Sequence, residues 1–250
     1  MKPKIYILSI IFLCLCAQMP CRAFFERDMH VLTMKDGLSD NTVYSICKDS
    51  QGFVWLGTQD GLNRFDGKRV RSFPFIGETN GLADLTEPFP GLLCFQSRDT
   101  LYAFDLRGER FLPVRTAEGH AIHAIGTQPG LGHTLWVLTP SELLQMEQVP
   151  SASGDTLRLR TIGRHAGWEG LGDRLSRLSL SADGRHLCVA DAYGRLVVAE
   201  ADRPDHYTLV DLGVGRSLAI THLYYDDCGY VWVSTLAQGV IRHDTKTGRN

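Results

Sequence analysis

The chain has 250 residues, and 26 lysines and arginines stand against 28 acidic residues, which gives a formal net charge of −2. Residues 1–23 contain Lys2, Lys4 and Arg22 and no acid, so without them the net charge is −5. A nucleic-acid partner needs a basic face, and this acidic balance argues against one.

Residues 1–23 are typical of a signal peptide. Lys2 and Lys4 precede an apolar run from Ile5 to Ala17, and the small residue Ala23 stands at the expected cleavage point. The alternative is an uncleaved membrane anchor, but the run is short for a span of about 20 residues. No other segment is long and apolar enough to cross a bilayer. We therefore expect cleavage and a soluble periplasmic chain over residues 24–250.

The first informative stretch runs from Gly37 to Gly67. Three runs rich in β-branched and aromatic residues, at residues 42–48, 53–58 and 62–65, are separated by clusters of Asp, Gln and Gly. This alternation predicts three strands joined by tight turns.

The same pattern recurs along the chain. With Trp55 as the reference, the equivalent positions are Cys94, Trp136, Leu187 and Trp232, at spacings of 39, 42, 51 and 45 residues. A period of about 40 to 50 residues is typical of four-stranded propeller blades. The sequence thus predicts an all-β fold, a β-propeller of four-stranded antiparallel blades with about five blades present.

The blades are expected at about residues 37–75, 76–116, 117–163, 164–210 and 211–250. Candidate fourth strands follow the repeat acids at residues 69–73, 110–114, 157–162 and 206–210, and candidate first strands lie at 121–125, 177–180 and 219–224. The last blade has no candidate fourth strand after it, although residues 29–33 could supply one.

The recurring residues have structural explanations. The position of Trp55 places a large apolar group between neighbouring sheets. Gly52 and Gly61 stand where turns require positive φ. Asp49, Asp66 and Asp226 can accept hydrogen bonds from the nearby backbone at strand ends.

The remaining candidates for chemistry are few. Cys47, Cys94, Cys188 and Cys228 match no zinc spacing, and free thiols are favoured over disulfides although an exported chain permits both. His120 and His123 have no third ligand. The sequence predicts no metal, no cofactor and no catalytic residue, and we interpret the chain as non-enzymatic.

The stretch from Asp36 to Gly67 resembles the two-component regulator propeller repeat. The resemblance rests on the following positions: Asp36, Gly37, Leu38, Asn41, Val43, Asp49, Gly52, Trp55, Gly57, Thr58, Gly61, Leu62, Phe65, Asp66 and Gly67. The copy at residues 226–244 matches more loosely, with Ser234 in place of Gly57.

This resemblance implies the periplasmic sensor region of a hybrid two-component system of the Bacteroidetes type. Such proteins have two seven-bladed propellers, a β-sandwich domain, one helix in the inner membrane and a cytoplasmic histidine kinase, and their ligands are typically oligosaccharides. The chain departs from that pattern because it ends at Asn250, without a second propeller or kinase motifs. The implied partners are an oligosaccharide, the remaining blades and downstream sensor domains, and a second copy through domains that this chain lacks.

The leading hypothesis is a non-catalytic ligand-sensing propeller. A secreted polysaccharide-acting enzyme and a propeller for protein–protein assembly are the alternatives. The turn between the second and third strands of each blade is the predicted ligand site, because the copies differ there. Its candidate residues are Gln59, Asp60, Arg98, Asp191, Tyr193 and Gln238, and Trp168, in a Gly-rich loop, is a stacking candidate.

Overall fold

The structure is a computed structural model. It describes residues 31–77, 79–116, 121–127, 134–150, 155–168, 171, 175–210, 212 and 219–250. The chain divides into a unit of residues 1–32 and a unit of residues 33–250, and the fold below is that of the second unit. The predicted signal peptide and His120 lie outside the described residues.

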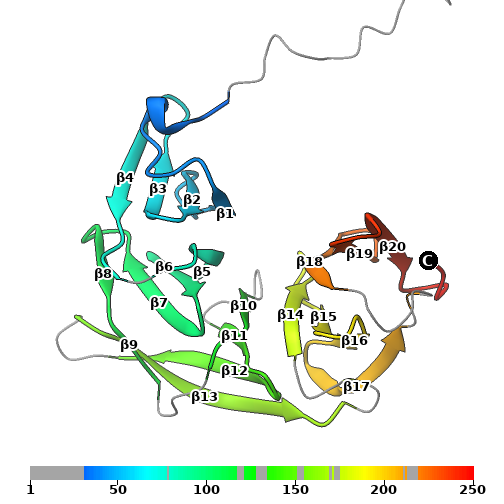
Figure 1. Cartoon of the computed structure of the whole chain (residues 1–250). Coiled ribbons are helices and arrows are strands. Elements are labelled where there is room, and N and C mark those ends of the chain that lie inside the picture. The colour runs from blue at the N-terminus through cyan, green and yellow to red at the C-terminus, as the bar shows by residue number, and fades with distance from the viewer. Residues whose placement is uncertain are drawn as a thin grey trace, which may run out of the picture. The chain divides into compact units, whose positions relative to one another are not determined.

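The described chain folds into five sheets in chain order, and all but one of their strand pairs are antiparallel (Figure 1). A short 3-10 helix, η1 (Met34–Asp36), precedes blade one, which contains β1 (Val43–Lys48), β2 (Val54–Thr58), β3 (Gly61–Phe65) and β4 (Val70–Pro74). Blade two contains β5 (Ala83–Phe89), β6 (Leu92–Ser97), β7 (Thr100–Asp105) and β8 (Arg110–Leu112). Blade three contains β10 (Ala124–Thr127), β11 (Thr134–Leu138), β12 (Glu142–Val149) and β13 (Leu157–Ala166), with β9 (Val114–Thr116) added at its edge.

Blade four contains β14 (Leu175–Leu180), β15 (His186–Asp191), β16 (Leu196–Glu200) and β17 (Arg203–Val210). Blade five has three described strands, β18 (Ile220–Tyr225), β19 (Tyr230–Thr235) and β20 (Val240–Asp244). Residues 31–33 lie in no strand, so they do not supply the fourth strand that residues 29–33 were expected to offer.

Neighbouring blades pack through their first strands. β1 contacts β5, β5 contacts β10, β10 contacts β14 and β14 contacts β18. The apolar core is accordingly divided into one cluster for each junction between blades. This arrangement confirms the β-propeller predicted from the repeat.

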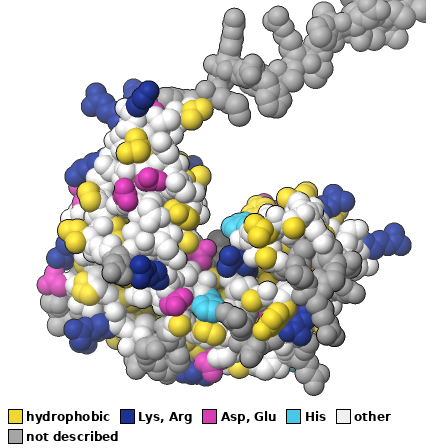
Figure 2. All heavy atoms as spheres, in the orientation of Figure 1, with side chains coloured by type: hydrophobic (Ala, Val, Ile, Leu, Met, Phe, Trp, Pro, Cys, Tyr) yellow, Lys and Arg dark blue, Asp and Glu magenta, His cyan; other side chains and the backbone are white. Residues whose placement is uncertain are grey.

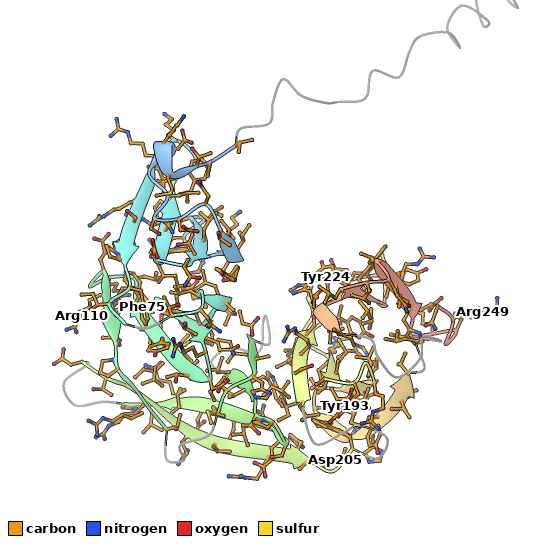
Figure 3. The ribbon with its side chains drawn as sticks, viewed as in Figure 1. Phe75, Arg110, Tyr193, Asp205, Tyr224 and Arg249 are labelled. Atoms are coloured by element: carbon orange, nitrogen blue, oxygen red, sulfur yellow. The ribbon has the colours of Figure 1, made fainter. Side chains whose placement is uncertain are left out.

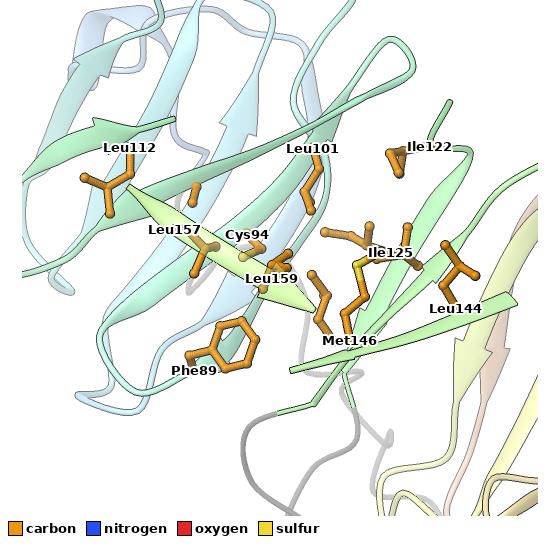
Figure 4. Close-up of a cluster of buried hydrophobic side chains, with 13 residues drawn as sticks. Phe89, Cys94, Leu101, Leu112, Ile122, Ile125, Leu144, Met146, Leu157 and Leu159 are labelled. Carbon is orange, nitrogen blue, oxygen red and sulfur yellow. The ribbon is translucent and has the colours of Figure 1, made fainter. Parts of the chain in front are cut away.

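The expected fourth strand of blade two, residues 110–114, is two strands in the structure. β8 pairs with β7, whereas β9 crosses to blade three and pairs parallel with β13, with Val114 opposite Leu157. The crossing is stabilised because Leu112, Leu157 and Leu159 are buried in the cluster shown in Figure 4. The chain thus ties the outer edges of blades two and three together, which local sequence patterns do not encode.

The repeat residues have the roles expected of them in blade one. The Trp55 ring is buried and stacks at 5.6 Å from Phe73, and its other neighbour, Phe104, belongs to blade two. Gly52 has a φ of +94°, and a Cβ on Gly61 would lie 2.4 Å from the Phe73 carbonyl oxygen.

Two positions of the repeat differ from expectation. In blade four, Cys188 and not Leu187 is the counterpart of Trp55, because Cys188 pairs with Ser179 as Trp55 pairs with Cys47. Between the last paired residues, the connection from β14 to β15 has one residue more (181–186) than the connection from β1 to β2 (49–53). A shift of one residue moves a side chain to the other face of the sheet.

Trp232 was expected between sheets, but 37% of it is exposed. In blade one the equivalent face is covered by blade two, whereas no described strand packs on this face of blade five.

Candidate functional site

A groove of about 770 Å³ lies between blades four and five. We call it the four–five groove. Its lining comes from residues 181–183, 186, 198–200, 203, 206, 208, 225–229, 245 and 246. These residues belong to the β14–β15 turn and the start of β15, to β16 and β17, to the end of β18 and the β18–β19 turn, and to the turn that follows β20. The groove therefore opens at the end of the blades where first strands turn into second strands.

Several large side chains of the first junction have smaller counterparts between blades four and five. Register pairing places Cys188 where blade one has Trp55, and Val210 where it has Phe73. On the facing sheet, the counterpart of Phe104 is a histidine, His243. These three residues are buried and do not line the groove. Two residues that do line it, Val198 and Thr208, stand where blade one has the longer Arg64 and Arg71.

An aromatic pair forms one wall of the groove. The rings of His186 and Tyr225 stack with centroids 5.6 Å apart and planes 16° apart. The Tyr225 hydroxyl lies 3.4 Å from the hydroxyl of Thr245, which donates to the carbonyl of Gly229 at 2.7 Å. Burial raises the pKa of Tyr225, and the neighbouring Asp183 and Asp226 carboxylates act in the same direction. The phenol is thus a neutral hydrogen-bonding group.

Two acids of the groove are held by the turns in which they lie. Asp226 accepts from the amides of Cys228 and Tyr230 and from the indole of Trp232, the last at 2.7 Å. Removal from water would raise its pKa, but these donors outweigh that effect and lower it. The Ser181 hydroxyl and the Arg185 amide lower the pKa of Asp183. Both carboxylates are ionised at neutral pH.

The groove also contains an ion pair and three polar side chains that are available to a ligand. The ion pair joins Glu200 and Arg203 at 2.5 Å. Within the described ranges, no hydrogen bond or ion pair engages the side chains of His206, Asp227 or Lys246. The groove thus offers donors and acceptors of both signs beside an apolar wall.

The residues predicted for the site lie at the opposite end of the strands. Gln59 is engaged in structure, because its Oε1 accepts from the Tyr44 hydroxyl at 2.9 Å and its Nε2 donates to the carbonyl of Thr79 at 3.0 Å. Asp60 and Arg98 are exposed, as is Gln238. They come from separate turns, and a shared ligand contact for them stays a prediction.

Trp168 and Asp191 are both buried, and a ligand contact for either stays a prediction. Trp168 is only 5% exposed and donates its indole N–H to the carbonyl of Pro204. Asp191 is fully buried and accepts from the amides of Tyr193 and Arg195. Tyr193 is exposed and is labelled in Figure 3, with the Arg195 guanidinium 5.5 Å from its ring centroid.

Sequence reasoning missed the four–five groove. Only the pairing of residues across strands brings its lining residues together and reveals that Val198 and Thr208 replace two arginines. The sequence comparison did not include the extra residue between β14 and β15. It therefore placed Leu187, and not Cys188, at the position of Trp55.

The charged side chains form no field of one sign on the face shown in Figure 2, where acidic and basic groups are interspersed. In the described ranges, no three His, Cys, Asp or Glu side chains group as metal ligands. Cys47, Cys94, Cys188 and Cys228 are free, and burial raises the pKa of Cys188 to about 12.

Residues 37–60 match the family model described as "Two component regulator propeller". The chain contains a repeat of this family. The match confirms the resemblance predicted from the residues between Asp36 and Gly67. Over 38 residues the chain is also 47% identical to histidine kinase P4 of Formosa agariphila, and this match spans 15% of the chain and 3% of that relative.

Two solved structures share the fold of this chain. One is the extracellular domain of a protein described as a one-component system of B. thetaiotaomicron, with a TM-score of 0.61 and 19% identity over 83% of this chain. The other is the extracellular domain of a protein described as a hybrid two-component system of the same organism, with a TM-score of 0.54 and 18% identity over 88% of this chain. The chain spans 27% and 36% of those two structures. No helix of the described part has the length and apolar character needed to cross a membrane.

Proposed function

We propose that this regulator propeller is a ligand-sensing module of an extracytoplasmic sensor in two-component signalling, and that its four–five groove binds an oligosaccharide without turnover. The observation that carries the proposal is the family match at residues 37–60. The two extracellular domains named above support it, because they belong to proteins described as a one-component system and a hybrid two-component system.

The chemistry of the groove favours a neutral sugar. Hydroxyls of a sugar both donate and accept, and Glu200, Arg203, His206 and Lys246 provide both kinds of partner. Asp183 and Asp226 keep their negative charge, and Asp227 adds another. Like charges repel at short range, so a uronic acid is a poorer ligand than an uncharged oligosaccharide. Binding would act on signalling by favouring one packing of the blades over another.

The test is calorimetric titration of the purified chain with neutral oligosaccharides and with their uronic-acid counterparts. Thr208→Trp introduces a bulky ring into the groove. Leu209→Trp is the matched control, because Leu209 is the next residue on β17, points to the other face and is exposed. We expect Thr208→Trp to weaken binding at least about tenfold and Leu209→Trp to leave it unchanged.

Three results would reject the proposal. Chromatography of the titrated sugar would reveal turnover if the chain were an enzyme. Absence of affinity for every sugar would favour a role in protein assembly. Equal loss of binding in both tryptophan variants would place the ligand outside the groove.

We also propose that residues 1–23 direct export to the periplasm and are then removed. Cell fractionation followed by mass spectrometry of the amino terminus tests this directly. An intact Met1 on cytoplasmic protein would contradict it.

A further inference from the structure

The outer strands of blade three place two arginines side by side. β9 and β13 run parallel, and Arg115 is the register partner of Arg158. Neighbouring strands lie about 4.8 Å apart, so the two side chains leave the sheet next to one another. Leu157 and Leu159 point to the buried side of β13, into the cluster of Figure 4. Arg115 and Arg158 therefore extend from the opposite, exposed face.

This pair lacks the counter-charge that other arginines of the same strand have. Arg160 forms an ion pair with Glu147, and Arg164 bonds to Glu142 at 2.7 Å. Across the part of the chain that the structure describes, neither Arg115 nor Arg158 bonds or pairs with an acid.

The fold gives no reason for this arrangement. Like charges on directly opposed residues of a sheet are destabilising, and the crossing strand could carry any polar residue on its outer face. The buried leucines hold the two backbones in register, so the cations cannot separate without loss of the parallel pairing.

A doubly charged oxyanion fits between two such groups. Guanidinium groups present planar forks that bind sulfate, phosphate and carboxylate oxygens with paired hydrogen bonds. We propose that Arg115 and Arg158 form a binding site for a sulfate or phosphate group carried by a soluble ligand. The site is separate from the four–five groove, which lies between other blades.

The surroundings favour a soluble ligand over a membrane surface. Glu142, Glu147 and Asp155 lie on or beside the same strands, and Arg110 is already paired with Asp155 at 2.8 Å. A flat anionic bilayer would approach these acids as closely as the two arginines. A single oxyanion group can instead bind the unpaired arginines alone.

The experiment compares the full chain with the double variant Arg115→Gln/Arg158→Gln. Arg164→Gln is the matched control, since it removes a cation of β13 that has its own acid. The probes are inorganic sulfate, inorganic phosphate, a sulfated polysaccharide, and vesicles of phosphatidylglycerol. We expect the double variant to bind sulfate and the polysaccharide at least about tenfold more weakly, with a shallower salt dependence, and the control to change less than about twofold.

Thermal unfolding gives a second readout that does not depend on the identity of the ligand. Sulfate stabilises folded proteins in general, but a bound anion adds a further shift that saturates with concentration. The melting temperature of the unmodified chain should therefore rise more with sulfate than that of the double variant. Without added anions, the double variant should melt no lower than the unmodified chain, because a repulsion has been removed.

Several outcomes would overturn the proposal. Sulfate could shift the melting temperatures of all three proteins equally, or the control could lose as much affinity as the double variant. Binding to vesicles that requires both arginines, with no affinity for sulfate, phosphate or the polysaccharide, would assign the pair to a membrane surface instead.

Discussion

The aspartate that stands six residues before Trp55 fixes the orientation of its indole. Asp49 accepts from the amides of Gln51 and Phe53 with one oxygen, and from the Trp55 indole at 2.7 Å with the other. Asp226 accepts the same three kinds of bond in blade five, from two turn amides and from the Trp232 indole. The acid thus joins the turn to the side chain that packs between blades, which makes the repeat motif one hydrogen-bonded unit.

Trp136 provides a natural contrast, because the residue six places before it is Gly130. Its ring is buried, yet its indole nitrogen has no hydrogen-bond partner among the residues that the structure describes. A buried donor without a partner costs about 1 to 3 kcal/mol. Trp136 therefore contributes packing without the bond that holds Trp55.

We predict that Trp55→Phe and Trp136→Phe differ in cost. Both lose ring volume, but only Trp55→Phe leaves the buried Asp49 carboxylate without its indole donor. We expect Trp55→Phe to destabilise the chain by about 1 to 3 kcal/mol more than Trp136→Phe. Denaturant unfolding followed by circular dichroism measures both, and equal losses would contradict the role given to the Asp49 bond.

A second residue of interest, Asp84, has a φ of +52° at an irregularity in the pairing of β5 with β6. Its carboxylate accepts from the amide of Ile125 in blade three at 3.3 Å. Burial raises its pKa, although this amide and the charges of Arg177 and His222 act against the shift.

We predict that Asp84→Asn stabilises the chain at neutral pH. A carboxyl group whose folded pKa is raised is harder to ionise in the fold, so its charge reduces stability as pH rises above the unfolded value of about 3.9. Asparagine keeps an acceptor for Ile125 and tolerates positive φ. The gain in melting temperature should be largest at pH 7 and should shrink toward pH 4. A loss at pH 7 would show that Arg177 and His222 stabilise the charged form.

At the scale of elements, β13 has one face that anchors β9 and one face that is exposed to solvent. Leu157 and Leu159 are buried and anchor the strand that crosses from blade two, while Ile162 is 48% exposed further along the same strand. We predict that Leu157→Ala or Leu159→Ala destabilises the chain by about 2 to 5 kcal/mol, and that Ile162→Ala costs less than about 1 kcal/mol.

Thermal unfolding of the three variants checks this prediction of a clamp between blades two and three. Proteolysis near residues 110–116 should also accelerate in the two leucine variants, because β13 is the one described strand with which β9 forms ladder hydrogen bonds. Similar stability of all three would mean that the parallel pairing adds nothing to the junction.

The sequence predicted most individual strands but not how all of them pair. The strands around Trp55 follow from alternation and turn residues, which are local signals. The crossing of β9 depends on the apolar face of β13, a partner more than 40 residues away. The register of blade four depends on one extra residue between β14 and β15. The sequence does not show this residue as an insertion, so it could not decide whether Leu187 or Cys188 is the counterpart of Trp55.

The candidate site could be predicted even less well than the fold. The predicted turns were chosen because the copies differ there, but variation is also what exposed turns tolerate. Trp168 and Asp191 are buried in the structure, and burial is a property of packing that the local sequence does not show. The four–five groove is lined by residues from separate strands and turns, which come together only after the strands have been paired.

At the scale of the whole molecule, the equivalent faces of blades one and five differ in burial. Leu62 of blade one is fully buried against blade two, whereas its counterpart in blade five, Val240, is 62% exposed. Tyr224, labelled in Figure 3, and Trp232 are exposed on the same face. The guanidinium of Arg242 lies 5.9 Å from the Trp232 ring centroid, much as Arg64 lies 5.8 Å from that of Trp55. This face has the form of a blade junction without its second sheet.

We predict that charge is tolerated on the face of blade five and not at the first junction. Val240→Glu removes an exposed apolar group, so it should leave the melting temperature nearly unchanged and reduce self-association, which exposed apolar patches promote. Leu62→Glu places a carboxylate in a sealed core and should unfold blade one, because an unpaired buried charge costs several kcal/mol. Circular dichroism and light scattering separate the two effects. If Val240→Glu destabilised the chain as much as Leu62→Glu, the face would be covered by another part of the molecule, and its exposure would not explain self-association.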